Sequence, residues 1–182
     1  MRRLVILVLL ALIVPCSFAQ AQSAQAPKPG PEAQRLAFML GSWQDQSEIR
    51  QSPLGPAGKE TGTSTCDWFT GKFQMVCRGE FVGPAGKAAN MAILGWDAGR
   101  KAYVGFGLNS NGWVGEMTGQ VTGNTWTFTT ETPLPDAKLG KVAKMRFTIV
   151  EVSPTMQTSR MEVSIDGGAW AVASEGKSTK VK

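Results

Sequence analysis

Turn-forming sequences recur along this chain about every 10–15 residues, and that spacing limits the folds open to it. Gly, Pro, Asn, Asp and Ser gather at 53–56, 71–72, 83–86, 97–99, 109–112, 122–124, 133–136, 153–154 and 166–168. The segments between are rich in Thr, Val, Phe and Trp, and residues 125–129 alternate strictly between polar and apolar. None of these segments is long enough for the crossover helix that a parallel sheet requires. We therefore predict about ten antiparallel strands joined in sequence by short turns.

Such a meander closes best into an up-and-down β-barrel, because closure removes the exposed strand edges. A two-sheet sandwich is the alternative. Before the first strand, Pro31 opens a short amphipathic helix, with Leu36, Met39 and Leu40 on one face and Gly41 at its end. We expect this helix at one end of the barrel. A barrel of eight to ten strands has room for a small ligand.

The N-terminus has the pattern of a cleaved export signal. Arg2 and Arg3 precede an apolar run over residues 4–14, which is shorter than the ~20 residues of a membrane span. The sequence Ala19-Gln20-Ala21 fits a cleavage site, as does Ala24-Gln25-Ala26. The alternatives are an uncleaved anchor, a core helix, or a lipoprotein anchored through Cys16, although Pro15 does not suit a lipidation site. We expect a signal peptide over 1–21, a flexible tether over 22–31 and one barrel domain over 32–182, in a periplasmic or secreted protein.

Cys66 and Cys77 remain after cleavage, and in an exported chain they invite a disulfide. Residues 63–69 and 73–82 read as two strands joined by a type II′ turn with Gly71 at its first central position. In that register, residues whose numbers add to 143 face each other, so the two cysteines lie directly opposite. The count places them at a hydrogen-bonded pair, with a Cα separation of about 5.5 Å. Two buried free thiols are the alternative, and a redox-active pair is disfavoured because the spacing is not C-x-x-C.

The absence of histidine excludes several classes of site. A Ser-His-Asp triad, a Cys-His pair, a histidine-ligated haem and an imidazole switch all need that side chain. No other ligand-spaced cluster suggests a metal, and we assign neither a cofactor nor a catalytic residue. The net charge of +5 falls to +3 when the signal peptide, with Arg2 and Arg3, is removed. The local basic cluster is expected to be solvated; it consists of Lys138, Lys141, Lys144 and Arg146. The sequence therefore predicts neither a nucleic-acid partner nor a membrane span.

The candidate ligand-binding residues are aromatic or otherwise unusual residues within strands. Trp68 shares a strand face with Cys66, Trp126 shares one with Phe128, and Trp113 shares one with Met117; core packing is the alternative for each. Tyr103 is the only tyrosine, and Phe106 lies between Gly105 and Gly107 within a strand. Trp43 is expected to plug the barrel beside the helix.

Arg78 and Glu80 are the charged candidates, and they share the strand face opposite Cys77. They enter the barrel if the disulfide faces outward, where desolvation would force them to pair or to meet a ligand's counter-charge. If the disulfide faces inward, they are solvated surface residues. Alternation along a strand determines which residues share a face but not which face is inside.

Several short segments, in this order, carry a resemblance. They are 36–43, ending in Gly41-Ser42-Trp43, and then 66–73, 94–97, 103–105, 146–149 and 164–170. The first is similar to the helix-then-Gly-x-Trp opening of lipocalin-like barrels. Together they resemble a family of exported bacterial proteins of unknown function, over roughly residues 32–177. The resemblance implies a lipocalin-like barrel and no activity. Haem-binding barrels of similar shape use a histidine, which this chain lacks.

The leading interpretation is a non-catalytic barrel that binds a small apolar or amphipathic molecule, and it rests on architecture and aromatic content. One alternative is an envelope protein with a filled core that binds a partner through its surface, which a large exposed apolar patch would favour. Another is a histidine-free enzyme that uses buried Glu, Tyr or Arg. A close pair of carboxylates inside the barrel would favour that last interpretation.

Overall fold

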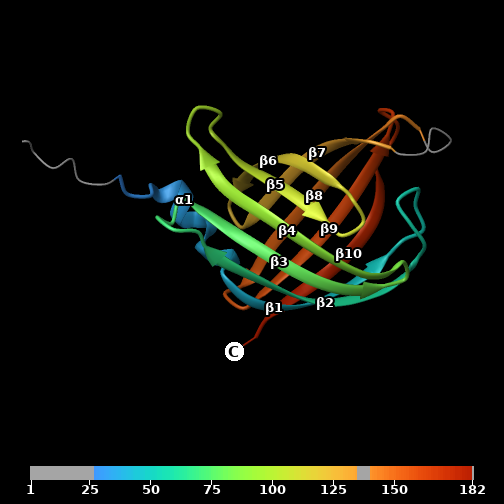
Figure 1. The fold of residues 1–182 in the computed structure, drawn as a ribbon, viewed down its shortest axis with the longest axis horizontal. Coiled ribbons are helices and arrows are strands. Elements are labelled where there is room, and N and C mark those ends of the chain that lie inside the picture. The colour runs from blue at the N-terminus through green and yellow to red at the C-terminus, as the bar shows by residue number, and fades with distance from the viewer. Residues whose placement is uncertain (1–26, 135–139, 182) are drawn as a thin grey trace, which may run out of the picture.

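The computed structural model describes residues 27–134 and 140–181 as a closed barrel of ten antiparallel strands (Figure 1). The strands are β1 Gly41–Ile49, β2 Gly58–Trp68, β3 Gln74–Gly83, β4 Gly86–Asp97, β5 Ala102–Asn109, β6 Val114–Thr122, β7 Thr125–Pro133, β8 Val142–Ser153, β9 Met156–Ile165 and β10 Ala171–Lys180. Each pairs with the next along the chain, and β1 closes the sheet against β10, with Trp43 opposite Lys180. The expected barrel is confirmed, and the sandwich alternative is wrong. The expected signal peptide, 1–21, lies outside the described residues.

A short helical segment covers one end of the barrel, as Figure 1 shows. The α-helix α1 spans Pro31–Arg35 and continues as a 3₁₀ helix, η1, over Leu36–Met39. The helical segment thus ends before Gly41, which opens β1 instead. Its side chains at Ala33, Leu36 and Met39 are buried in the barrel mouth. We call this the closed end and the opposite one the open end.

Hydrogen bonds from the strands hold this segment in place. The indole Nε1 of Trp43 donates to the Met39 carbonyl at 2.9 Å, and the Tyr103 hydroxyl donates to the Glu32 carbonyl at 3.0 Å. Lys180 donates from Nζ to the Phe38 carbonyl at 3.3 Å. Helix carbonyls that have no partner within the helix are therefore satisfied by the barrel wall. Among the described residues, no helix combines the length and apolar character that crossing a membrane requires.

The hairpin between β2 and β3 keeps the expected register and joins Cys66 to Cys77 in a disulfide. The turn differs from the expectation: Lys72 donates from its backbone N to the Phe69 carbonyl, and Phe69 donates to the Gln74 carbonyl. The hydrogen-bonded pair is therefore Phe69 with Gln74, so the cysteines occupy a non-hydrogen-bonded pair. Their Cα atoms lie 4.0 Å apart, closer than the expected 5.5 Å. Both Gly71 and Lys72 have positive φ in this turn.

Two apolar clusters fill much of the interior. The larger lies beneath the helical segment and contains Leu36, Met75, Leu94, Tyr103 and Trp126, with the disulfide against it. The second contains Ala143, Met145, Val163 and Ala173, with Trp113 and Leu134 packed against it. It lies near the open end, on the β8–β10 side, because these positions are at the ends of strands remote from the helix.

Candidate functional site

The burial of the disulfide shows which face of β2 and β3 is inside. Cys66 is 7% exposed and belongs to the core, so its face of β2 and the Cys77 face of β3 point inward. Strict alternation then places Arg78 and Glu80 on the outside, where both are exposed. Phe106 also points outward: its neighbours are Ile93 on β4 and Glu116 on β6, and it is 52% exposed. These three candidates therefore do not line the interior.

The other six candidates do face the interior, from two regions. Trp68, Tyr103, Trp126 and Phe128 belong to the closed-end cluster or pack against it, and Met117 packs beside them. Trp113 joins the second cluster. The structure thus separates the aromatic candidates into a cluster beneath the helix and one residue, Trp113, near the open end.

The polar atoms of the closed-end aromatics are already satisfied by the protein. Tyr103 lies between Trp96 and Trp126, with ring centroids at 5.0 and 4.8 Å, and donates to the helix. Burial raises the pKa of its hydroxyl, so it stays protonated and keeps that bond. Trp126 donates from Nε1 to Glu151, which also pairs with Arg35 of α1. These residues hold the helical segment, and we assign them no contact with a ligand.

A strip of polar side chains lines the interior on the opposite side. The polar strip consists of Asp45 and Ser47 on β1, Glu60 and Ser64 on β2, and Asn90 on β4; all lie on inward-facing positions. The first four are half-buried, and Asn90 is exposed although it faces inward. Solvent therefore reaches this part of the interior through the open end.

Two carboxylates lie close together within the polar strip. Asp45 pairs with Gly62 across β1 and β2, and Ser47 pairs with Glu60, so Asp45 and Glu60 are diagonal neighbours on one face. Ser64 donates from its hydroxyl to Asp45 at 2.8 Å. Burial and the charge of Asp45 raise the pKa of Glu60, because both penalise a second negative charge at this place.

In the open half of the barrel, none of the inward-facing positions on the ten strands carries a Lys or Arg that could neutralise these carboxylates. The single inward-facing Lys or Arg among those described positions is Lys180, which sits at the closed end with Nζ 4.7 Å from the Trp43 ring centroid. Neither Asp45 nor Glu60 forms an ion pair within the described part of the chain. The open half of the interior is therefore acidic.

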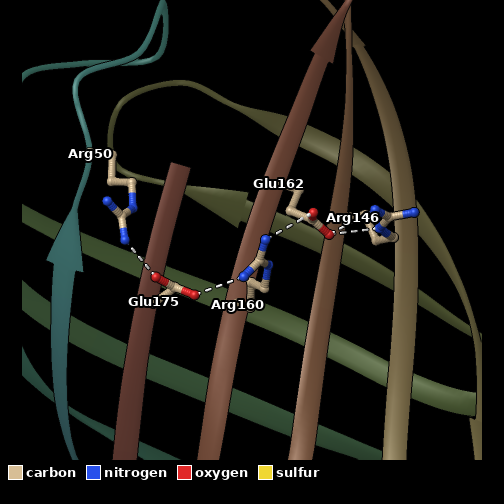
Figure 2. Close-up of polar contacts among 5 residues, drawn as sticks. All are labelled: Arg50, Arg146, Arg160, Glu162 and Glu175. Atoms are coloured by element: carbon tan, nitrogen blue, oxygen red, sulfur yellow. Dashed lines mark hydrogen bonds and ion pairs between the residues drawn. The ribbon is translucent and has the colours of Figure 1, made fainter. Parts of the chain in front are cut away.

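The basic residues of the neighbouring strands lie on the outer surface instead. Figure 2 shows a chain of alternating charges that runs from β8 across β9 and β10 to the residue after β1: Arg146, Glu162, Arg160, Glu175 and Arg50. Three of the four ion pairs measure 2.8 Å, and the Arg160–Glu162 pair measures 3.4 Å. These charges satisfy one another at the surface, so the arginines are unavailable to the interior carboxylates.

Two aromatic rings pack over glycines of the interior, Phe81 next to the polar strip and Trp113 over β5 and β6. Phe81 covers Gly62 and Gly79, where a Cβ atom would collide with its ring. Trp113 covers Gly107 and Gly115, where a Cβ would come within 3.0 and 2.9 Å of the indole. The Trp113 indole N–H is buried and lacks a hydrogen-bond partner among the described residues. A buried donor without a partner is costly, and a ligand that offers an acceptor would satisfy it.

Asp45, Glu60 and Ser64 were not among the residues expected from the sequence. The signal was present in the strand alternation: Glu60 and Ser64 share a face with Cys66, and Asp45 shares one with Trp43. The expected interior position of Trp43 already implied that Asp45 faces inward, but for β2 the alternation carried no information until Cys66 was known to be inside. The described residues contain no group of three His, Cys, Asp or Glu side chains that could hold a metal ion.

Comparisons with known proteins identify the family and the fold. The family model described as "Protein of unknown function (DUF1579)" matches residues 28–180. No curated protein matches the sequence. Among solved structures, Rv2717c from M. tuberculosis superposes with a TM-score of 0.62 at 14% identity, over 85% of this chain and 100% of that one. The S-type phycobiliprotein lyase CPES from Guillardia theta gives a TM-score of 0.52 at 15% identity, over 82% and 92%. At these identities the likeness concerns the barrel fold.

Proposed function

The chain belongs to the DUF1579 family of proteins of unknown function, and from that premise we propose that its barrel binds a small amphipathic molecule in the open half. The observation that carries this proposal is the contrast between two sides of the interior. Phe81 lies beside a polar strip that solvent reaches, Trp113 covers β5 and β6 of the same open half, and the strip holds two carboxylates without a cation among the described residues. Binding pockets for small molecules combine these features: mostly apolar walls and a few polar groups that orient the ligand.

The polar strip determines the charge of the ligand. The carboxylates of Asp45 and Glu60 accept hydrogen bonds, and Ser64 already uses its hydrogen on Asp45. A fatty acid or another anion would face two carboxylates with no compensating cation among the described interior residues. The ligand is therefore a neutral hydrogen-bond donor or a protonated amine.

The apolar part of the ligand faces the aromatic rings. Phe81 and Trp113 offer flat surfaces, and Met117 offers a deformable one. The free indole N–H of Trp113 calls for an acceptor on the same molecule. A compact ring or short chain that carries an amine or hydroxyl at one end and an acceptor at the other fits these groups.

Native mass spectrometry of the protein purified without detergent, compared with its denatured mass, tests for a bound molecule directly. A second assay uses two dyes: cationic thioflavin T and anionic anilinonaphthalene sulfonate. We expect the cationic dye to bind more tightly, and Asp45→Asn or Glu60→Gln to weaken its binding by about tenfold, the loss of one charge-assisted contact. Glu48→Gln, an exposed carboxylate on the outside of β1, is the matched control and should have no effect.

Tighter binding of the anionic dye would refute the charge assignment. Equal binding of the cationic dye to the wild type, Asp45→Asn and Glu60→Gln would refute the site. Trp113→Phe keeps an aromatic ring and removes the N–H, so it separates ring stacking from the hydrogen bond.

We further propose that the protein is exported and works in the periplasm or outside the cell. The sequence pattern of residues 1–21 supports this, and a disulfide such as Cys66–Cys77 is compatible with an oxidising compartment. Expression of the full chain with intact-mass analysis should give a mature N-terminus between residues 20 and 27. A full-length mass would contradict cleavage, and a lipid mass on Cys16 would replace it with lipidation.

A further inference from the structure

Three polar side chains form a row across the interior wall, and only one of them, Asp45, belongs to the polar strip. Asp45 on β1 pairs with Ser178 on β10, and Ser178 pairs with Gln157 on β9. All three point inward: Asp45 alternates with the buried Trp43, Ser178 is itself buried, and Gln157 shares the inner face of β9 with the buried Val163. We call these three residues the acceptor row.

The acceptor row contains an oxygen atom that the protein leaves without a donor. The side-chain Oε1 of Gln157 is buried and has no hydrogen-bond partner among the described residues. The Gln157 residue as a whole is half-buried, so its amide lies at the border of the space that solvent reaches. A buried acceptor without a partner costs free energy, and a donor group on a ligand would offset that cost.

The inner face of β10 leads from the open end to the acceptor row and carries only small side chains. Ser174, Gly176 and Ser178 occupy its inward positions in turn. At Gly176 a Cβ atom would collide with the Ser47 hydroxyl, so no larger side chain fits there. Ser174 and Gly176 face the interior and are still half-buried rather than buried, so solvent reaches them. A small molecule that enters at the open end therefore reaches the acceptor row along this face.

The spacing within the acceptor row suits a head group with several donors. Neighbouring strands lie about 4.8 Å apart, so Ser178 stands midway between Asp45 and Gln157, whose Cα atoms are about 10 Å apart. A group placed above Ser178 is within reach of both longer side chains. Ser64 donates to Oδ2 of Asp45, and Oδ1 remains for the ligand. A primary ammonium has three N–H donors for the three acceptor oxygens, and its charge offsets the carboxylate.

We propose that the ligand of the open half carries a primary ammonium group that donates hydrogen bonds to Asp45, Ser178 and Gln157. This inference rests on the proposed function and narrows its ligand class to primary amines. Glu60 is the diagonal neighbour of Asp45 and adds a second carboxyl group close to the same point.

Other head groups leave part of the acceptor row unsatisfied. A neutral alcohol has one O–H donor and no charge, so Asp45 would lose water without gaining a counter-charge. A quaternary ammonium has no N–H and is bound by cages of aromatic rings. The acceptor row contains no aromatic residue, and Trp43, which precedes Asp45 on the inner face of β1, already packs against the Lys180 ammonium.

Isothermal titration calorimetry with three probes that share one ring tests this inference: phenethylamine, its N,N,N-trimethyl derivative and 2-phenylethanol. We expect phenethylamine to bind at least about tenfold more tightly than either of the others. Gln157→Leu and Ser178→Ala should each weaken phenethylamine binding by about fivefold to tenfold and leave the trimethyl probe unchanged. Gln46→Leu is the matched control, because Gln46 is exposed on the outer face of β1; it should have no effect.

Gln157→Glu separates a role in binding from a role in folding. This variant keeps the acceptor oxygens and adds a negative charge, so it should bind phenethylamine more tightly than the wild type does. A disturbed fold would instead weaken the binding of every probe. Thermal melts that match the wild type would show that the Leu and Ala variants are folded.

Equal affinities for phenethylamine and its trimethyl derivative would overturn the primary ammonium, as would unchanged phenethylamine binding in Gln157→Leu. The proposed function would survive that result if Asp45→Asn still weakens thioflavin T binding. If the dye binds Asp45→Asn as it binds the wild type, the proposed function and this inference are both wrong.

Discussion

Replacing Trp43 with alanine should lower the free energy of unfolding by about 4–5 kcal/mol. Trp43 is 2% exposed and lies where the helical segment meets β1. Its indole contacts the Phe38 ring at a centroid distance of 5.9 Å and the Lys180 ammonium at 4.7 Å, and it donates a hydrogen bond to the Met39 carbonyl. The variant would therefore lose three contacts that hold the helical segment at the closed end.

The magnitude follows from the area and the hydrogen bond. A buried tryptophan covers about 200 Å², and an alanine at the same place retains about a quarter of that area. At ~25 cal/mol per Å², the lost transfer energy is close to 4 kcal/mol. The Met39 carbonyl also loses its donor, which adds about 1 kcal/mol. Trp43→Phe keeps most of the ring and loses only the hydrogen bond and part of the area, so we expect a cost of about 1–2 kcal/mol.

Urea unfolding monitored by near-ultraviolet circular dichroism, with the disulfide intact, measures these changes. For a domain of this size, 4–5 kcal/mol corresponds to a fall in Tm of roughly 10–20 °C. Trp170→Ala is the control: Trp170 is 40% exposed and packs on Arg146, and its loss should cost less than about 1 kcal/mol. A cost below 1 kcal/mol for Trp43→Ala, or one equal to that of Trp170→Ala, would show that Trp43 does not hold the closed end.

Two further predictions concern the interior. Burial and Asp45 raise the pKa of Glu60, so the folded state binds its proton more tightly than the unfolded chain does; this stabilising contribution is present at acid pH and is lost as the pH rises through the folded pKa. Glu60→Gln should thus raise Tm at pH 7 and give no gain near pH 4. The hydrogen bond from Arg50 lowers the pKa of Glu175, so its carboxylate stabilises the fold when ionised. Glu175→Gln on the outer surface should therefore lower Tm at pH 7 and have less effect at acid pH. Equal melting profiles of Glu60→Gln and the wild type at both pH values would contradict this reasoning. Removing the disulfide with Cys66→Ala and Cys77→Ala should cost about 3 kcal/mol, the loop-closure value for a separation of 11 residues, measured by urea unfolding; no change would mean that the bridge is not formed in the purified protein.

Local rules accounted for much of the fold. The recurrence of turn residues predicted the strand number and order, because short turns permit only antiparallel neighbours. The register of the β2–β3 hairpin followed from its turn position, and Cys66 lies opposite Cys77 as expected. The sequence did not predict which opposite residues of that hairpin form hydrogen-bonded pairs. That depends on whether the last such pair before the turn is Phe69 with Gln74 or the next pair inward.

The candidate site was less accessible to local rules. Arg78 and Glu80 were candidates because their shared face could be assigned but its side of the barrel could not. Asp45 and Glu60 come from different strands, and their closeness depends on the pairing of β1 with β2 across a connection without a clear hairpin signal. Sequence alternation alone does not report such a neighbour.

The sequence by itself thus determined the strands, their order, the helix before them and which residues share a face. These properties depend on turn chemistry and on a period of two, both of which act within a few residues. Only the tertiary structure decided which face is inside, because that choice depends on the apolar area buried by all ten strands together. In the closed barrel, the faces of Trp43 and Cys66 are inside, so Asp45 and Glu60 lie in the interior and Arg78, Glu80 and Phe106 lie on the outer surface.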